Sequence, residues 1–197
     1  MGREAQVHAA FADGVDWGRL QYEAPKLIFR GTSRRVFDGA ALQGVRANGA
    51  DLLLADGARF TLGEVQATRW ADAIANPKSR LEKIGVKPRM RVAVIGLADA
   101  TFSAELVACG ASVQNDLSAL DLLFYAADSA EDLAKVGDLA PALAAKGALW
   151  IISHKGKGAT VKDIEVMAAA KAVGLVDNKV VGFSDTLTAL RFVRRQL

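Results

Sequence analysis

The sequence is poor in cysteine, histidine and long apolar runs. Its 197 residues contain one cysteine, Cys109, and two histidines. A single cysteine excludes an intrachain disulfide, and so few cysteines and histidines argue against a zinc site, so we expect no metal. The longest apolar runs, such as residues 148–152, are far shorter than the roughly 20 residues that cross a bilayer, and residues 1–5 contain no apolar signal core. We therefore expect a cytoplasmic protein without a transmembrane segment.

The charge balance also lacks a strong bias. Lysine and arginine number 25 against 22 acidic residues, which gives a net charge of +3. The positive residues are interleaved with acidic ones, and no arginine-rich helix or aromatic RNA-binding signature accompanies them. This pattern favours solvated surface charge over a nucleic-acid footprint. Hydrophobic residues make up 51% of the chain, which is enough for one large core or two small ones.

The first part of the chain has the pattern of an antiparallel meander. Short alternating segments are separated by turns, and Asn48-Gly49 and Asp56-Gly57 are strong hairpin signals because these residues tolerate positive φ. Spacing at i, i+3, i+4 and i+7 then predicts a helix over 63–75, with Trp70 on its inner face. The expected strands are residues 6–12, 19–23, 26–30, 34–38, 42–47, 51–55 and 59–62.

Seven short strands closed by one helix resemble the pleckstrin-homology-like superfold, with Trp70 where such domains bury a helix aromatic. We therefore expect an α+β domain over residues 1–76. The resemblance is topological and implies no ligand, because superfolds host unrelated functions. Arg30, Arg34 and Arg35 could line a mouth for an anionic ligand, but exposed hairpin arginines are the simpler interpretation.

A linker separates this domain from an expected second domain over residues 77–197. Asn76 is predicted to cap a short helix with Pro77 at its first position and Gly85 as the left-handed cap at its end. From residue 91 the pattern changes to alternating strands and helices. Continuous apolar runs over 91–95, 121–126 and 148–153 are typical of parallel strands covered on both faces.

Helix signals follow each of these strands. Thr101 opens a helix over 102–109, Ser129 with Asp132 forms a capping box before a helix reaching Leu143, and Thr160 with Asp163 forms another. The inner face of the last helix is expected to include Ile164 and Met167. Residues 179–184 and 188–194 are expected to form a terminal antiparallel hairpin. The second domain is therefore predicted to be an α/β, Rossmann-like open sheet that ends in an antiparallel hairpin.

This order of elements resembles the class I S-adenosylmethionine-dependent methyltransferase fold, and residues 144–152 are similar to the passage into that family's fifth strand. The chain also resembles an uncharacterised bacterial family, a domain of unknown function. The residues that carry this second resemblance are 76–81, 85–96, 147–150, 174–180 and 184–193.

The glycine loop departs from the methyltransferase pattern. After the strand over 91–95 only Gly96 is present, while Val94, Ala98 and Ala100 occupy the positions of the expected acid and the later glycines. Seven residues separate the short strand 111–113 from the next strand, too few for a crossover helix, so one strand–helix unit is predicted to be missing. The resemblance implies S-adenosylmethionine as the candidate cofactor, with three candidate cofactor-binding residues: Gly96, Asp99 and Asp116.

Other candidates follow the strands, because ligands bind beyond the carboxyl ends of an open α/β sheet. The segment 154–158 could form a cationic, glycine-flexible cradle for an anion, but without the Gly-Lys-Ser/Thr ending of a P-loop a mobile surface loop is the simpler interpretation. Aspartates that precede helices, Asp99 and Asp128, are also typical caps. The candidate ligand-binding residues are Asp128, Ser129, His154, Lys155 and Lys157, and no catalytic residue is assigned.

Three hypotheses follow. The eroded glycine loop and the missing unit favour a non-catalytic ligand-binding, protein-binding or scaffolding protein, whose partner is another protein or a small anionic ligand. The first alternative is a diverged S-adenosylmethionine-dependent methyltransferase. The second is a sensor of anionic ligands that acts through Lys155 and Lys157.

Overall fold

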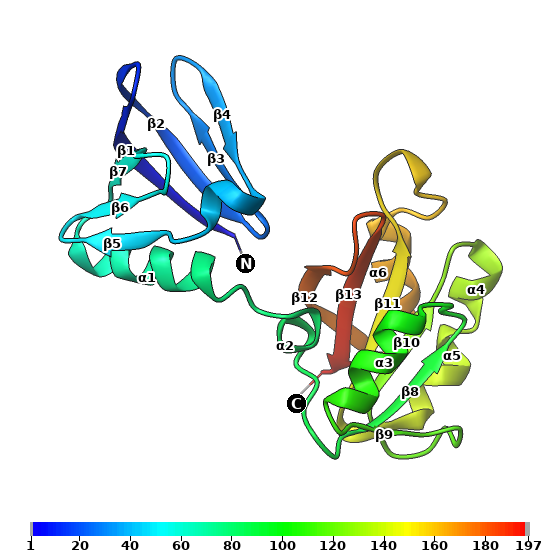
Figure 1. Ribbon diagram of the computed structural model, residues 1–197. Helices are drawn as coiled ribbons and strands as arrows, with labels where there is room; N and C mark the ends of the chain where they lie inside the picture. The colour runs from blue at the N-terminus through cyan, green and yellow to red at the C-terminus, as the bar shows by residue number, and fades with distance from the viewer. Residues whose placement is uncertain (1, 196–197) are drawn as a thin grey trace. The chain divides into compact units, whose positions relative to one another are not determined.

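The computed structural model describes residues 2–195 and divides between Lys78 and Ser79 into two compact units (Figure 1). Each unit contains its own sheet and its own hydrophobic core. Among the described residues, no helix has both the length and the apolar character needed to cross a membrane.

The first unit is one antiparallel sheet with the strand order β4-β3-β2-β1-β7-β6-β5. Adjacent strands along the chain pair with each other, and β1 also pairs with β7, which joins the two halves of the sheet. The strands are β1 (Arg3–Phe11), β2 (Gly14–Glu23), β3 (Lys26–Arg30), β4 (Arg34–Phe37), β5 (Arg46–Asn48), β6 (Asp51–Leu53) and β7 (Arg59–Thr61).

Turn chemistry explains most of these boundaries. Gly49 lies in the β5–β6 turn with φ of 57°, a conformation that glycine adopts without a steric penalty. The strand predicted over 42–47 was wrong. A 3₁₀ turn, η1 (Gly39–Leu42), occupies its start, and the strand begins only at Arg46. Ala41 and Leu42 lie in this turn and still pack against the core, so the alternation of apolar residues did not distinguish the turn from a strand.

One helix, α1 (Glu64–Ala75), follows the last strand of the first unit. Its buried residues recur with the predicted helical spacing, so that part of the prediction is confirmed. The side chain of Trp70 is 2% exposed and lies in the same core cluster as Phe29 and Phe60. The four buried helix residues are Ala67, Trp70, Ala71 and Ile74.

The start of the second unit differs from the prediction. Asn76 ends α1, and the next helix, α2 (Arg80–Ile84), is capped by Ser79. The Ser79 hydroxyl accepts a hydrogen bond from the amide of Glu82 at 3.2 Å, and the Glu82 carboxylate accepts one from the Ser79 amide at 2.8 Å. This reciprocal box satisfies two amides, which a cap at Asn76 followed by Pro77 would not do. Gly85 ends α2 with φ of 90°, as predicted.

The second unit is a six-stranded sheet with the order β12-β13-β11-β10-β8-β9 (Figure 1). Strands β9, β8, β10 and β11 are parallel, and β13 pairs antiparallel with both β11 and β12. The strands are β8 (Arg91–Ile95), β9 (Ser112–Val113), β10 (Leu120–Ala126), β11 (Leu143–His154), β12 (Leu175–Gly182) and β13 (Leu187–Arg194).

Both faces of this sheet are buried. On β10, Leu122 and Phe124 belong to a cluster that includes residues of α2 and of α3 (Ala100–Ala108), whereas Leu123 and Tyr125 belong to the opposite cluster. The second cluster includes residues of α5 (Val136–Leu139) and α6 (Asp163–Ala172). This two-sided burial explains why the strand sequences are continuously apolar rather than alternating.

Two helix predictions in this unit were wrong. The helix expected to reach Leu143 is divided into α4 (Ala130–Ala134), α5 and a 3₁₀ turn, η2 (Ala140–Ala142). Pro141 lies in η2 and lacks the amide hydrogen needed to continue α5. The last helix starts after Lys162, whose amide donates to the Glu165 carboxylate at 2.7 Å, rather than after Thr160. The inner face also differs from the prediction, because Ile164 is 72% exposed while Val166 is buried, although Met167 packs against the core as a partly buried residue.

The predicted loss of one strand–helix unit is confirmed. Between β9 and β10 the described chain forms turns and bends and contains no helix. The strand β9 is only two residues long and lies at the edge of the sheet beside β8. The region beyond the carboxyl end of β9 is therefore less enclosed than the region beyond β8, β10 and β11.

Candidate functional site

A small cavity lies at the carboxyl ends of β8, β10 and β11 and has a volume of about 230 Å³. The register of these strands aligns the residues at their carboxyl ends. Ile95 pairs with Tyr125 and Ala126 pairs with Ile152, so the residues that follow each strand meet at one edge. The lining residues are Gly96, Leu97, Ala98, Ala126, Asp128, Ile152, His154, Thr186 and Leu187.

Gly96 begins the loop from β8 to α3 and has φ of 73°, in the left-handed region that favours glycine. A Cβ atom at this position would lie 3.5 Å from the carbonyl oxygen of Ala126, which is ordinary contact. The backbone conformation, rather than crowding, therefore requires glycine here. Gly96 also lines the cavity.

The structure brings Asp128 and His154 together. The Asp128 carboxylate oxygen Oδ1 lies 2.7 Å from Nδ1 of His154 and also accepts a hydrogen bond from the His154 amide at 3.1 Å. The two side chains are 39% and 46% exposed. A neutral imidazole that donates its Nδ1 hydrogen to a carboxylate keeps a lone pair on Nε2. The two hydrogen bonds hold the imidazole beside Asp128 at the edge of the cavity, and in the tautomer protonated at Nδ1 the Nε2 atom is a hydrogen-bond acceptor.

Asp99, a predicted cofactor ligand, has both carboxylate oxygens occupied by other groups. One accepts from the Phe102 amide at 2.8 Å, which caps α3, and the other accepts from the Arg80 guanidinium at 2.7 Å. Burial acts to raise the pKa of Asp99, but these hydrogen bonds and the charge of Arg80 outweigh it and lower the pKa. The structure thus gives Asp99 a capping and ion-pairing role.

Two further predicted residues lie near the same edge without lining the cavity. Asp116 is exposed in the turn after β9 and accepts a hydrogen bond from the Ser118 hydroxyl at 2.7 Å. Ser129 caps α4, because its hydroxyl accepts from the Asp132 amide at 3.1 Å and donates to the Asp132 carboxylate at 2.8 Å. Hydrogen bonds from Ser129 and Lys135 lower the pKa of Asp132.

The expected anion cradle is only partly available. The ammonium group of Lys155 donates to the carbonyl oxygen of Ser184 at 2.7 Å, which ties the loop to the β12–β13 turn. Lys157 lies exposed in the 3₁₀ turn η3 (Gly156–Gly158) and does not line the cavity. Only His154 of this segment lines it. Within residues 2–195, no group of three or more histidine, cysteine or acidic side chains is placed to hold a metal ion.

Sequence reasoning missed Leu97, Thr186 and Leu187 as cavity residues and left Asp128 and His154 unpaired. Thr186 and Leu187 reach the edge because β13 runs antiparallel to β11, where His154 pairs with Leu187. The Asp128–His154 pair could have been suggested by the rule that parallel strands end at one edge, but only if β10 and β11 were known to be neighbours.

Comparison with known proteins gave matches among solved structures alone. No family model matches the chain, and no curated protein matches it. A TehB-like S-adenosylmethionine-dependent methyltransferase from Corynebacterium glutamicum is 15% identical over 67% of this chain and 97% of its own, with a TM-score of 0.46. An S-adenosylmethionine-dependent methyltransferase from Aquifex aeolicus is 16% identical over 57% of this chain and 86% of its own, with a TM-score of 0.46. A putative methyltransferase from Thermoplasma acidophilum is 8% identical over 96% of both chains, with a TM-score of 0.44.

The second unit is a Rossmann-like, mostly parallel sheet that ends in an antiparallel hairpin and has helices on both faces, and the first unit is an antiparallel sheet with one helix. The matches contradict the first hypothesis, that of a non-catalytic binding or scaffolding protein. The solved structures that overturn it are described as methyltransferases, several of them S-adenosylmethionine-dependent. The resemblance to an uncharacterised bacterial family remains a prediction.

Proposed function

We propose that the second unit is a diverged S-adenosylmethionine-dependent methyltransferase and that His154 accepts the proton released by the methyl acceptor. The Asp128–His154 pair carries this proposal, because it is a fixed imidazole at the strand edge where α/β folds hold their ligands. A general base of this kind must lie within hydrogen-bond reach of the proton it removes, and His154 lines the cavity in which the acceptor would bind.

The placement of the edge residues fits an adenosyl cofactor. Gly96 and Asp116 follow adjacent parallel strands, β8 and β9, so backbone and carboxylate are available on one edge. The enclosed volume of about 230 Å³ is below the roughly 300 Å³ at which ligand cavities usually begin. A bound cofactor would therefore extend from the cavity along the open side near β9. When bound, S-adenosylmethionine supplies an electrophilic methyl group.

The chain's own residues have distinct roles in this proposal. Asp128 holds the imidazole in the tautomer that leaves Nε2 unprotonated, and His154 removes the proton from an acceptor N–H or O–H at that atom. The side chains of Leu97, Ile152 and Leu187 give the cavity an apolar wall that reduces water access. The acceptor has to be small or presented on an extended chain, because the cavity is small.

For the first unit we propose a pleckstrin-homology-like domain, over approximately the predicted residues 1–76, followed by the methyltransferase-like domain over 77–197. The strand order β4-β3-β2-β1-β7-β6-β5 with the closing helix α1 supports this proposal. The fold assigns no ligand to this domain.

Calorimetric titration of the full chain with S-adenosylmethionine and S-adenosylhomocysteine tests the cofactor assignment. We expect saturable binding that Gly96→Arg abolishes, because an arginine side chain would fill the loop and strain its backbone. Gly156→Arg is the matched control, since Gly156 also has positive φ but lies outside the cavity. Absence of saturable heat for both ligands would refute the proposal.

The proton role is tested separately by the ¹⁵N chemical shifts of the His154 ring. The wild type should contain mainly the tautomer protonated at Nδ1, and Asp128→Asn should redistribute the two tautomers. The His154→Gln variant assigns the signals, since the chain has only two histidines. An unchanged tautomer ratio in Asp128→Asn would show that Asp128 does not position the imidazole, regardless of whether the chain binds the cofactor.

A further inference from the structure

The outer face of the first sheet carries three arginines in one cross-strand row. Arg34 on β4 pairs with Arg30 on β3, and Arg30 pairs with Arg19 on β2. Side chains alternate between the two faces of a strand, so these three point away from the core that contains Leu20 and Phe29. Directly opposed side chains have Cβ atoms about 5 Å apart, and like charges in that arrangement destabilise a sheet. An anion bound across the row would relieve this repulsion.

Neighbouring carboxylates neutralise only part of this arginine row. Glu4 lies 3.5 Å from Arg19, and because both side chains are about half exposed the pair contributes little free energy. The Arg30 guanidinium donates instead to the uncharged Gln21 side chain, at 2.7 Å from its amide oxygen. Within residues 2–195, no carboxylate forms an ion pair with Arg30 or Arg34, so two guanidinium groups of the row are available to an anionic ligand.

The row brings together residues that are separate in the sequence. Arg35 directly follows Arg34, but strand alternation points it to the opposite face, where it donates to the Asp13 carboxylate at 2.7 Å. Arg19, from another strand, completes the row with Arg30 instead. The spacing of charges along the sequence therefore indicated dispersed surface charge, whereas the register of β2, β3 and β4 concentrates it.

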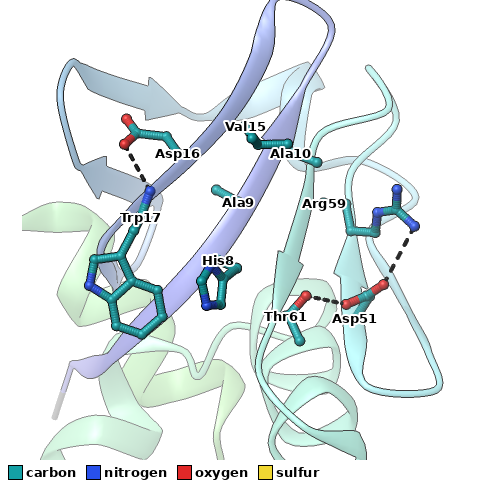
Figure 2. A pocket seen from close by; sticks show the side chains of 9 residues that line it. All are labelled: His8, Ala9, Ala10, Val15, Asp16, Trp17, Asp51, Arg59 and Thr61. Carbon is teal, nitrogen blue, oxygen red and sulfur yellow. Dashed lines mark hydrogen bonds and ion pairs between the residues drawn. The ribbon is translucent and has the colours of Figure 1, made fainter.

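An exposed indole lies next to the arginine row on the same face. Trp17 precedes Arg19 by two residues on β2, about 7 Å along the strand, and its side chain is 54% exposed. Its ring centroid lies 4.3 Å from that of His8, which pairs with it across the sheet (Figure 2). Asp16 points to the opposite face, where the amide and hydroxyl of Thr32 donate to its carboxylate. The indole therefore provides an aromatic surface beside the arginines.

Space for an uncharged ring lies beside this indole. A hollow of about 650 Å³ on the outer face is lined by Trp17 and Ala10, together with residues of β6 and β7 (Figure 2). Ala10 pairs with Val15 on one side and with Arg59 on the other, so a methyl group lies between two longer side chains and the surface is depressed there. The lining ion pair of Arg59 with Asp51, at 3.7 Å, has no net charge. A flat aromatic group can therefore lie against the indole without meeting an excess of charge.

We propose that the outer face of the first sheet binds single-stranded nucleic acid, with phosphates on the row of Arg19, Arg30 and Arg34 and one base stacked on Trp17. Proteins hold single strands by this combination of positive charge along the backbone and aromatic side chains under the bases. The row lies on an open sheet face, which suits an extended polymer, whereas small ligands are bound in concave sites that enclose them. This binding is independent of the methyl transfer proposed for the second unit.

Fluorescence anisotropy of a labelled oligothymidylate of about ten nucleotides tests the arginine row in the full chain, since single-strand sites span about 4–16 nucleotides. Arg30→Gln and Arg34→Gln should each reduce the slope of log affinity against log salt by about 0.7, the value for one phosphate contact on a single strand. Arg69→Gln, at an exposed position on α1 outside the row, is the matched control and should leave the slope unchanged. An unchanged slope in both row variants would overturn the proposal.

Quenching of tryptophan fluorescence tests the stacked base separately, because Trp17 is 54% exposed whereas Trp70 and Trp150 are 2% and 0% exposed. The oligothymidylate should quench saturably, and an abasic phosphodiester of the same length should bind at least about fivefold more weakly. Trp17→Leu should weaken binding of the oligothymidylate by a similar factor and leave the salt slope unchanged, because it removes no charge. Equal affinity for the abasic chain, or an unchanged affinity in Trp17→Leu, would contradict the stacking.

Two other polyanions distinguish nucleic acid from different partners of an arginine row. Polyglutamate and vesicles of phosphatidylserine with phosphatidylcholine, each at matched charge, should bind at least about fivefold more weakly than the oligothymidylate, because neither offers a base to the indole. Comparable binding of polyglutamate would assign the row to an acidic protein, and comparable binding of vesicles would assign it to a membrane surface; either result overturns the proposal. No saturable signal up to about 1 mM oligothymidylate at low salt also overturns it. Circular dichroism verifies that each variant is folded.

Discussion

Arg80 joins α2 to α3 and to the β12–β13 turn, so its replacement should destabilise the second unit. The guanidinium donates to Asp99 at 2.7 Å and to Glu105 at 3.0 Å. It also lies 4.9 Å from the Phe102 ring centroid and 4.7 Å from that of Phe183. Its side chain is 15% exposed. The test variant is Arg80→Met, which retains most of the aliphatic side chain and removes the charge.

The magnitude follows from these contacts. Glu105 is 37% exposed, so its pair contributes little. The Asp99 pair is more enclosed, and hydrogen bonds to charged groups contribute about 1.5–3 kcal/mol each. The two cation–π contacts add about 0.5–1 kcal/mol each at partly exposed sites. We therefore expect Arg80→Met to lower the free energy of unfolding by about 2.5–5 kcal/mol, the sum of these contributions, while Asp99 retains its hydrogen bond from Phe102.

The same contacts define a pH dependence. The pKa of Asp99 is lowered in the folded state, so its stabilising effect is fully present above the unfolded value of about 3.9 and is lost as the pH falls through the lower folded value. The difference between wild type and Arg80→Met should therefore persist at pH 7 and become smaller below about pH 4.

Urea unfolding followed by circular dichroism measures this difference, with the slope m verifying that the unfolded states are comparable. Lys171→Met, at an exposed position on α6, is the matched control and should change the free energy of unfolding by less than about 0.5 kcal/mol. A loss for Arg80→Met no larger than that of the control, or a difference that stays constant down to pH 3, would refute the reasoning.

Three further predictions concern stability, each measured by urea unfolding. Gly147→Ala should lower the free energy of unfolding by about 1–3 kcal/mol, because a Cβ atom there would clash with the Leu120 carbonyl oxygen. Gly158→Ala is the control and should leave the free energy of unfolding nearly unchanged, because no atom lies near its Cβ position. Equal effects of the two substitutions would contradict the close packing at Gly147. Ser129→Ala should cost about 1 kcal/mol through loss of the α4 cap, and an unchanged midpoint would exclude that cap as a stabilising feature. Val166→Ala should cost about 1.5–3 kcal/mol and Ile164→Ala under about 0.5 kcal/mol, while the reverse order would restore the original prediction for this helix face.

Local sequence signals predicted elements well where one physical effect dominates. The strand over Arg91–Ile95 has the predicted bounds, since a continuous apolar run between turn residues has few alternatives. Helix starts were less accurate, because several residues near each start can cap. The helices begin after Ser79 and Lys162 instead of after Asn76 and Thr160. At Ser79 and Lys162, the glutamate three residues later accepts a hydrogen bond from the amide of the capping residue.

The sequence by itself determined most of the strands, the helix α1, that no crossover helix separates β9 from β10, and that polar residues follow β10 and β11. Only the tertiary structure decided that Asp128 and His154 form a pair. The parallel register of β10 with β11 matches residues 26 positions apart, from Leu122 with Ala148 to Ala126 with Ile152, and carries that offset to Asp128 and His154. Register depends on how two distant strands pack their side chains, which short-range sequence patterns do not encode.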